Sequence, residues 1–373
     1  MSTLLRSAVI AGVLAAPVVS QAAAPTLGDV FKASGITESG YVDATFNYNN
    51  RQFDAAPLSY GGSNVDSFTL NQVGLMFSAT PSSGFGGVLD ILGGHDAAAL
   101  ATDGAGDIVI KQAYAQYASG ALTVMGGRFV TLAGSEVIAA TGNSNVTRSL
   151  LFGIQPLTHT GVRASVKAGP ATITGGVSNS TGMAPAGCGP FCGGTAADIN
   201  EQKAIELQVA LAPTEALSLA LTGYKGQEVV NGAGASISPS LIDFVGSLQL
   251  TKALSLGLNV DHRSDDNAII TGSSPTKYDG AALYVNMQLT DAFRGGVRAE
   301  YLKIKDGATP APGSVTEKLK EVTLTGAYAA ASNFDLVTDV RFDKDDGVPF
   351  ASFITGTAKD SMASVVVSGV YKF

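Results

Sequence analysis

The 373-residue sequence contains no run of roughly 18 or more apolar residues, so no segment of the mature chain can cross a bilayer as a helix. It is also poor in charge. Asp, Glu, Lys and Arg make up 14% of its residues, against about 25% in typical globular proteins, and the mean hydropathy is positive. A chain of this kind usually contacts lipid. Because only helices and closed β-barrels pair every backbone group within a membrane, we expect a barrel.

Other residue types are scarce as well. There is no tryptophan, and two cysteines are too few for a disulfide-held miniprotein or a four-cysteine zinc site. The three histidines show no metal-binding spacing, so we expect neither a metal nor a cofactor. The net charge of −8 and the pI near 4.9 disfavour a nucleic-acid partner, because no basic patch is available to release counterions. Glycine, in contrast, is abundant, with 45 residues and no collagen-like period, which favours strands and turns.

The first residues resemble an export signal. Arg6 precedes the apolar stretch 8–19, which is too short to span a bilayer, and small residues surround the expected cleavage site after Ala22 or Ala24. We expect residues 1–22 to be a cleaved signal peptide, residues 23–35 a short periplasmic segment and residues 36–373 the barrel. Export combined with a lipid-contacting composition indicates the outer membrane of a Gram-negative cell.

Apolar and polar residues alternate with period two along most of the mature chain, as in strands that face lipid on one side and water on the other. In the stretch 253–263, Leu254, Leu256, Leu258 and Val260 share one face, and polar residues share the other. A helix would place its apolar residues three and four positions apart.

Short and long connections also alternate, which is typical of outer-membrane barrels with short periplasmic turns and long external loops. The predicted short turns lie near residues 81–83, 119–120, 169–170, 213–214, 252–253, 291–292 and 332–333. The predicted long loops are 49–67, 93–108, 131–158, 179–202, 226–239, 264–277, 305–317 and 344–360. We therefore predict an all-β, transmembrane, antiparallel up-and-down barrel of about sixteen strands with both mature termini periplasmic. Fourteen or eighteen strands would also fit, because Asn71, Gln72 and Lys111 blur the alternation in the second to fourth strands.

The stretch 127–163 resembles the bacterial β-barrel porin family of the second type. The similar residues are Gly127-Arg128-Phe129, Glu136, Asn145, the run from Arg148 to Phe152 and the run from Pro156 to Arg163. The segments 27–30, 34–36 and 39–43 fit as well. The resemblance implies a single-chain, water-filled barrel without catalysis. With no tryptophan for the aromatic girdles of such barrels, we expect the tyrosines to serve: Tyr41, Tyr48, Tyr114, Tyr117, Tyr224, Tyr284, Tyr301, Tyr328 and Tyr371.

A barrel of this width encloses an aqueous channel, so charges on the inward face are candidates for selecting solutes. They are Asp43, Asp90, Lys111, Arg128, Arg163, Lys167, Glu206, Asp243, Asp261, Arg263, Arg294, Arg298, Glu300, Glu321, Asp335, Asp339 and Arg341. The alternative is that each of them only keeps the water-facing wall polar by pairing across strands.

The long connection 131–158 is the candidate for a constriction loop. It carries Glu136 and Arg148 among the apolar pieces 137–138 and 150–152, and packing inside the barrel would bury these. Alternatively, the segment stays outside and packs against neighbouring loops or a second subunit. His159, at its end, is either a pH-dependent gate or a hydrogen-bonded structural residue.

Two further features lie in predicted external loops. Cys188 and Cys192 are expected to form a disulfide that pins a loop tip, since export passes through an oxidising compartment. Asp343, Asp345 and Asp346 resemble a calcium loop only in part, and a solvated acidic loop is the favoured interpretation.

The sequence therefore predicts an outer-membrane porin for passive diffusion of small hydrophilic solutes and ions, with a modest cation preference from its acidic balance. We expect contacts with outer-membrane lipid and lipopolysaccharide, and a homotrimer by analogy. The alternative is a non-conducting structural or adhesive barrel that presents its loops to a partner. An enzyme is not expected, because no nucleophile lies beside a recognisable base.

Overall fold

The computed structural model describes residues 27–49, 66–100, 107–183, 201–229, 236–267, 275–305, 316–346 and 361–373. The predicted signal peptide and the Cys188–Cys192 pair lie outside the described residues.

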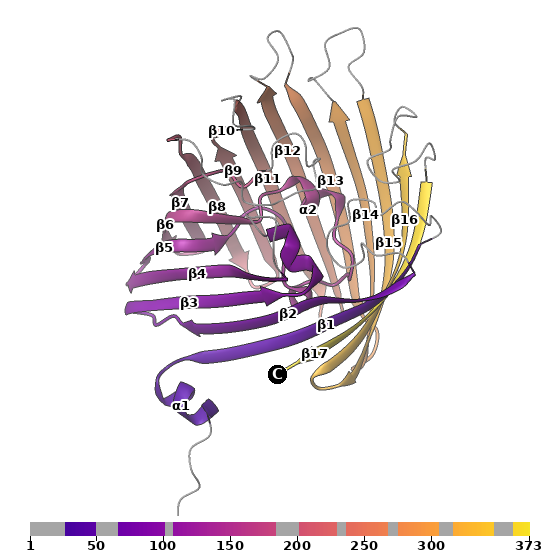
Figure 1. The fold of residues 1–373 in the computed structure, drawn as a ribbon, viewed down its shortest axis with the longest axis horizontal. Coiled ribbons are helices and arrows are strands. Elements are labelled where there is room, and N and C mark those ends of the chain that lie inside the picture. Colours follow the sequence, from indigo (N-terminus) through magenta and orange to yellow (C-terminus); the bar gives the residue numbers. More distant parts are fainter. Residues whose placement is uncertain are drawn as a thin grey trace, which may run out of the picture.

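The described residues form one antiparallel sheet that closes into a barrel (Figure 1). Its strands are β1 (Thr37–Asn49), β2 (Ser67–Ala79), β3 (Gly84–Gly93), β4 (Ile108–Ser119), β5 (Leu122–Val130), β6 (Thr158–Ala168), β7 (Ala171–Ser178), β8 (Ala204–Thr214), β9 (Leu217–Lys225), β10 (Glu228–Val229), β11 (Ser236–Thr251), β12 (Leu254–Asn267), β13 (Thr276–Gln288), β14 (Phe293–Lys305), β15 (Thr316–Ala331), β16 (Phe334–Asp345) and β17 (Ser361–Lys372). The barrel closes because β1 pairs with both β2 and β17.

The predicted count of sixteen strands is confirmed. The two-residue β10 pairs with β11 directly beyond β9, since Lys225 faces Ser240 and Glu228 faces Ile237. β9 and β10 therefore form one crossing, interrupted for two residues.

The short turns fall where the sequence predicts them. They join β2 to β3, β4 to β5, β6 to β7, β8 to β9, β11 to β12, β13 to β14 and β15 to β16. Gly120 and Gly169 occupy two of these turns with φ of 58° and 61°, a backbone conformation that glycine adopts without strain.

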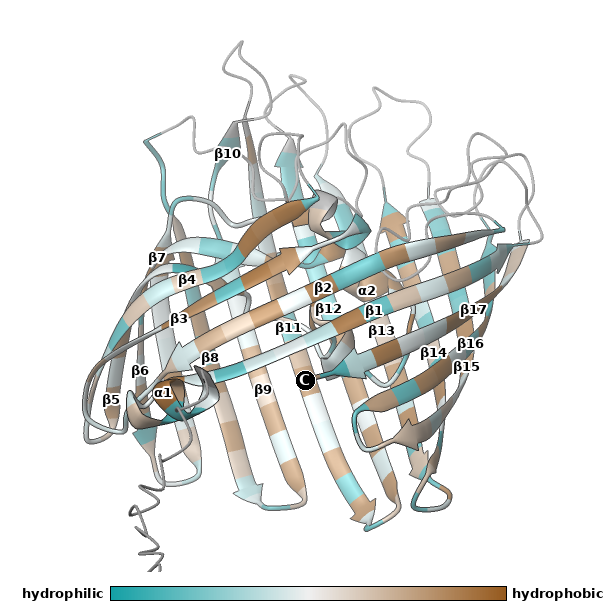
Figure 2. Cartoon of the chain, turned by 60° about the horizontal axis from the view of Figure 1, so that its bottom comes forward, coloured by the Kyte–Doolittle hydropathy of each residue, from teal (hydrophilic) through white to brown (hydrophobic). Residues whose placement is uncertain are grey.

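Burial alternates along the strands as the period-two pattern requires. In β15, Glu317, Leu319 and Glu321 are buried on the inner face, whereas Lys318 and Val322 are exposed on the outer face. Figure 2 shows hydrophobic and hydrophilic residues alternating along the strands. The wall thus presents apolar side chains to lipid and polar side chains to the lumen.

Two of the residues that blur the alternation are the extra residues of β-bulges. Asp43 faces Gln72 and Ala44 faces Leu70, so that Asn71 is the extra residue in β2. Asp90 faces Gln112 and Ile91 faces Ile110, so that Lys111 is the extra residue in β4. A bulge lets two successive side chains point inward, and Asn71 and Gln72 are both buried.

The helices are short. α1 (Leu27–Ala33) lies outside the barrel, where Phe31 packs on Phe77 of β2 with ring centroids 5.7 Å apart (Figure 1). The 3₁₀ helices η1 (His95–Leu100) and η2 (Ala140–Gly142) and the helix α2 (Leu150–Ile154) belong to long connections. Within the described ranges, no helix is long and apolar enough to span a membrane.

The predicted tyrosine girdle is wrong for four residues, one of which is the half-buried Tyr114, opposite Gly127 on the inner face. Tyr41, Tyr224 and Tyr284 are buried and point inward, and Tyr41 Oη donates to Gln72 Oε1 at 2.6 Å. The outer face instead exposes Tyr48, Tyr117, Tyr301, Tyr328 and Tyr371, together with phenylalanines. A buried tyrosine hydroxyl favours a polar partner, and Tyr224 Oη accepts such a bond from Leu132 N at 2.9 Å.

Candidate functional site

Residues 131–157, between β5 and β6, lie inside the barrel (Figure 1). We call them the lumen loop. Thr131 N donates to Leu157 O at 2.9 Å and closes the neck of the loop. Asn143 Nδ2 donates to the carbonyl oxygens of Val137 and Ala139, each at 2.8 Å, and fixes the first half. Local hydrogen bonds therefore give the loop a defined shape within the lumen.

Apolar side chains anchor the second half of the loop. Leu150, Leu151 and Ile154 of α2 are buried in one cluster with inward residues of β13, β14, β15 and β17, namely Tyr278, Ala282, Tyr284, Leu302, Ile304, Leu319 and Met362. Fully burying one such Leu or Ile side chain contributes about 1.5–3 kcal/mol. Val137 differs from the expectation, because it is 47% exposed while its neighbour Ile138 is buried.

Arg298 of β14 is the centre of the charged contacts with the loop. Its side chain is fully buried, and Nη1 lies 2.8 Å from Glu136 Oε1 and donates to Thr147 O at 2.7 Å. Nε lies 3.0 Å from Glu300 and 3.0 Å from Glu321, both on the wall. One guanidinium thus joins the loop to two strands.

The carboxylates around Arg298 also hold loop backbone. Ser149 N donates to Glu136 Oε2 at 2.7 Å, and Leu150 N donates to Glu300 Oε2 at 2.8 Å. These bonds satisfy amide groups at the start of α2, where negative charge is favoured.

β16 makes a second set of contacts. Asp339 Oδ2 accepts from Thr147 N at 2.8 Å, and Arg341 Nη1 donates to the carbonyl of Arg148 at 2.6 Å. Arg341 also pairs with Asp343 at 2.7 Å. The predicted constriction residue Arg148 is buried and donates to the carbonyls of Val137, Val146 and Ile138. Its side chain therefore stabilises the loop from within.

β12 binds the loop through amides and a guanidinium. Gln155 Nε2 donates to Asp261 Oδ2 at 2.7 Å and to Asn259 Oδ1 at 3.0 Å. Arg263 donates to Ile154 O at 2.9 Å and pairs with Asp265 at 2.7 Å.

The loop also contacts β2. Gln72 Nε2 donates to Ile138 O at 2.9 Å and to Asp96 Oδ2 at 2.8 Å, while its Oε1 accepts from Ala140 N at 2.9 Å. The lumen loop therefore bridges β2 and the group β12–β16, and divides the lumen.

Other predicted lumen charges pair on the wall, away from this group. Lys111 lies 2.9 Å from Asp90, and Arg163 lies 2.6 Å from Glu206 and over the ring of Phe129 at 4.1 Å. Asp43 is buried and accepts from the Ser368 hydroxyl.

Three predicted residues occupy separate places. His159 is buried and stacks on Tyr224 with centroids 4.9 Å apart, a packing that favours the structural interpretation. Arg128 is half-buried where β4 and β5 separate, and it donates to Leu100 O and Thr158 Oγ1 at 3.2 Å each. Lys167 is exposed beside the turn between β6 and β7. The structure does not bring these three into the cluster around Arg298.

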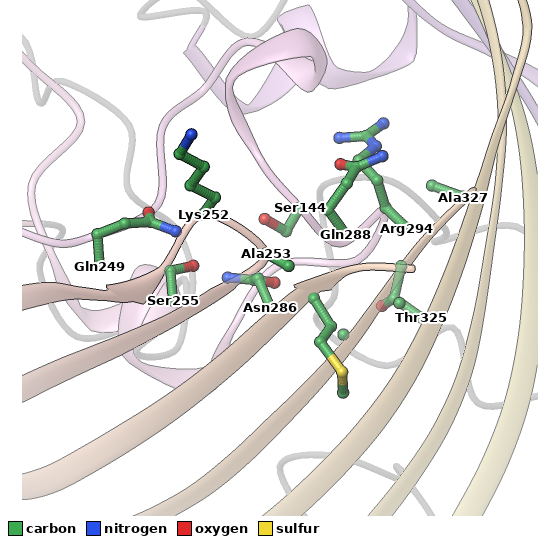
Figure 3. A pocket seen from close by; sticks show the side chains of 13 residues that line it. Ser144, Gln249, Lys252, Ala253, Ser255, Asn286, Gln288, Arg294, Thr325 and Ala327 are labelled. Carbon is green, nitrogen blue, oxygen red and sulfur yellow. The ribbon is translucent and has the colours of Figure 1, made fainter. Parts of the chain in front are cut away.

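Open space lies beside the loop (Figure 3). A pocket of about 540 Å³ is lined by Ser144 of the loop and by Ser255, Asn286, Gln288 and Thr325 of the wall, with Lys252 and Arg294 among its charged residues. These neutral residues were not predicted from the sequence. The alternation places the wall residues on the inner face. Serine and asparagine are also common in turns, however, so the residue types alone did not mark them as pocket residues.

Carboxylates dominate the buried charge. Among the described residues, fifteen Asp and Glu side chains are buried, against six Lys and Arg side chains. No group of three or more His, Cys, Asp or Glu side chains within these residues is arranged to hold a metal ion. The interior of the barrel therefore carries an excess of acidic groups.

A closed sixteen-stranded barrel with a polar loop in its lumen is the architecture of outer-membrane channels. The channel DcaP of Acinetobacter baumannii has a TM-score of 0.63 and 14% identity to this chain, covering 91% of this chain and 97% of that one. An anion-selective porin from Comamonas acidovorans has a TM-score of 0.59 and 15% identity, covering 91% and 99%. A loop-deletion variant of OmpT, an outer membrane protein of Vibrio cholerae, has a TM-score of 0.60 and 13% identity, covering 91% and 99%. At these identities the similarity shows the fold alone.

The family follows from the sequence itself. The model described as "putative beta-barrel porin-2, OmpL-like" matches residues 35–373, so the chain belongs to this family of outer-membrane porins. The match confirms the predicted resemblance and extends it to the last strand. No curated protein matches the chain.

Proposed function

We propose that this porin is a channel for passive diffusion of small hydrophilic solutes and ions, in which the lumen loop forms the constriction. The observation that carries the proposal is the bridge that the loop makes between β2 and β12–β16. A sixteen-stranded barrel is too wide for its wall side chains to fill, so an inserted loop sets the free cross-section. The family and fold favour a channel over an enzyme.

The same channel prefers cations modestly. Its support is the excess of buried carboxylates over buried Lys and Arg side chains in the described residues. A passage lined mainly by one sign of charge concentrates counterions of the other sign. An anion-selective porin has a similar fold, so the fold alone does not set the sign of the selectivity. The charged side chains inside the barrel set it.

The pore-lining set combines the wall charges with the loop. Charges that hold the loop act indirectly by fixing the constriction, whereas those beside open space, such as Arg294 and Lys252, meet solutes directly. Asp261, Arg263, Asp339 and Arg341 belong to the charges that hold the loop. The other predicted wall charges keep the inner face polar; they are Asp43, Asp90, Lys111 and Arg163.

The assembly is a homotrimer in the outer membrane, with both mature termini periplasmic and lipopolysaccharide around its external half. A trimeric form of the Vibrio cholerae OmpT has the same fold. The C-terminal Phe373 lies at the short-turn end, where its N and O atoms pair with Gly40.

Liposome swelling tests the channel directly. Proteoliposomes in isotonic solutions of neutral sugars of increasing size should swell at rates that fall with sugar size. A folded barrel that admits no small sugar would contradict the proposal and favour a non-conducting structural or adhesive barrel.

A further inference from the structure

Six of the fourteen lysines in the sequence lie on the outer face of four neighbouring strands. They are Lys277 of β13, Lys303 and Lys305 of β14, Lys318 and Lys320 of β15, and Lys344 of β16, and we call them the lysine patch. All are exposed except Lys303, which is half-buried. Arg148, Arg163, Arg263, Arg298 and Arg341, in contrast, are buried inside.

The strand register places these lysines directly opposite one another. Lys277 faces Lys305, Lys303 faces Lys318, and Lys320 faces Lys344. Side chains in such pairs start about 4.5–5.5 Å apart at Cβ, and like charges there repel. The arrangement therefore favours an anion that lies between them.

Carboxylates of the protein neutralise only part of the patch. Asp346 lies 2.5 Å from Lys320 and 3.4 Å from Lys344, and Asp279 faces Lys303 while it contacts His262 at 2.6 Å. Within the described residues, no carboxylate contacts Lys277, Lys305 or Lys318. These three lysines remain available to an external anion.

The position of the patch along the barrel indicates which anion it meets. In β14 the exposed outer residues run from Phe293 through Val297 to Tyr301, and Lys303 follows. Ten residues at about 3.3 Å each, tilted by about 40°, rise about 25 Å, which is the height of the apolar band of such barrels. Lys303 thus lies at the far boundary of this band, at the ends of the strands that lead into the long loops.

We propose that the lysine patch binds the phosphate groups of lipopolysaccharide in the outer leaflet. Lysine ammonium groups bind phosphate as compact point charges. The exposed Leu283, Val322 and Phe342 lie directly below the patch and provide an apolar surface for the acyl chains. This site lies on the lipid-facing surface and is separate from the channel, and it rests on the proposed orientation in which the long loops are external.

The test compares two triple variants with the same loss of charge. Lys277→Gln/Lys305→Gln/Lys318→Gln removes the lysines that lack a carboxylate contact. Lys32→Gln/Lys203→Gln/Lys225→Gln removes three exposed lysines elsewhere. Each protein is folded in detergent, checked for heat-modifiable migration, and titrated with deep-rough lipopolysaccharide, with bound glycolipid counted by native mass spectrometry.

The wild type and the second variant should bind alike, and the patch variant at least tenfold more weakly. Dephosphorylated lipid A should bind the wild type as weakly as lipopolysaccharide binds the patch variant. Equal binding of lipopolysaccharide by the patch variant and the wild type would overturn the proposal. Equal binding of dephosphorylated lipid A, or equal competition by phosphatidylglycerol, would overturn it as well, because the site would then recognise acyl chains or any anionic lipid.

Discussion

The guanidinium of Arg298 lies 2.8 Å from the carboxylate of Glu136, and this ion pair joins strand β14 to the lumen loop in a fully buried setting. Glu300 and Glu321 complete the surroundings of the same guanidinium. This guanidinium thus faces three carboxylates, of which Glu321 also lies 4.0 Å from Arg341. The position of the loop in the lumen depends strongly on this group.

Replacing Arg298 by methionine should lower the free energy of unfolding by about 3–5 kcal/mol, because it leaves buried carboxylates without their counter-charge. Urea unfolding in lipid vesicles measures the loss. Arg294→Met is the matched control. Its pair with Asp335 is 3.4 Å long and the arginine side chain is 44% exposed, so that about 0–1 kcal/mol is expected. Equal losses in the two variants would contradict the assigned role of Arg298.

Gly280 of β13 provides a steric test of the packing of α2. A Cβ atom at this position would collide with Leu151 Cδ2 of the loop, so Gly280→Ala should destabilise the protein by about 1–3 kcal/mol through overpacking. In a Leu151→Ala background much of this cost should disappear, and a double-mutant cycle measures the coupling. Gly326→Ala, whose Cβ would meet Phe293 at an ordinary 3.6 Å, is the control. Additive effects of the Gly280 and Leu151 substitutions would show that Leu151 of α2 does not pack against Gly280.

His95 of η1 gives a pH-dependent contribution. A hydrogen bond to Asp96 raises the pKa of His95 above its usual value of 6.5. The interaction therefore stabilises the fold fully below about pH 6.5, and the contribution is lost as the pH rises through the higher folded-state pKa. An NMR titration of His95 should show a midpoint above 6.5 that falls in Asp96→Asn. An unchanged midpoint in that variant would mean that Asp96 is not the cause.

The proposed cation preference can be tested at the inner rim. Glu317 and Asp345 are buried on the inner face at the long-loop ends of β15 and β16. Glu317→Gln/Asp345→Asn should therefore shift the reversal potential in a salt gradient toward zero. Asp266→Asn removes a charge whose side chain is 58% exposed and paired with Lys225 on the outer side, and it should leave the reversal potential unchanged. A shift in the control but not in the double variant would assign the selectivity to outer charges.

Much of the barrel could be predicted because its physics repeats along the sequence. The side chains of each strand must alternate between lipid and water, and each short turn must reverse the chain. The number of strands and the positions of the turns therefore follow from the period-two pattern and from the turn residues between the strands. The alternation became unclear at Asn71 and Lys111 because each is the extra residue of a β-bulge. An interrupted period in a strongly alternating strand is itself a signal of a bulge.

The site was only partly predictable. The apolar residues 150–152 indicated that the connection 131–158 needs a surface to pack on, and Arg298, Asp339 and Arg341 were recognised as inward charges. Their convergence on the loop could not be seen, because contacts such as that of Glu136 with Arg298 join positions 162 residues apart. Asn143 and Gln155, which shape and dock the loop, have no distinctive sequence pattern.

Single-channel conductance of the refolded protein in a planar bilayer tests the central claim most directly. The account predicts discrete steps in proportion to salt concentration, below the conductance of a variant in which the lumen loop is released by Arg298→Met. A folded, heat-modifiable barrel that never conducts would contradict the claim and identify the lumen loop as a plug.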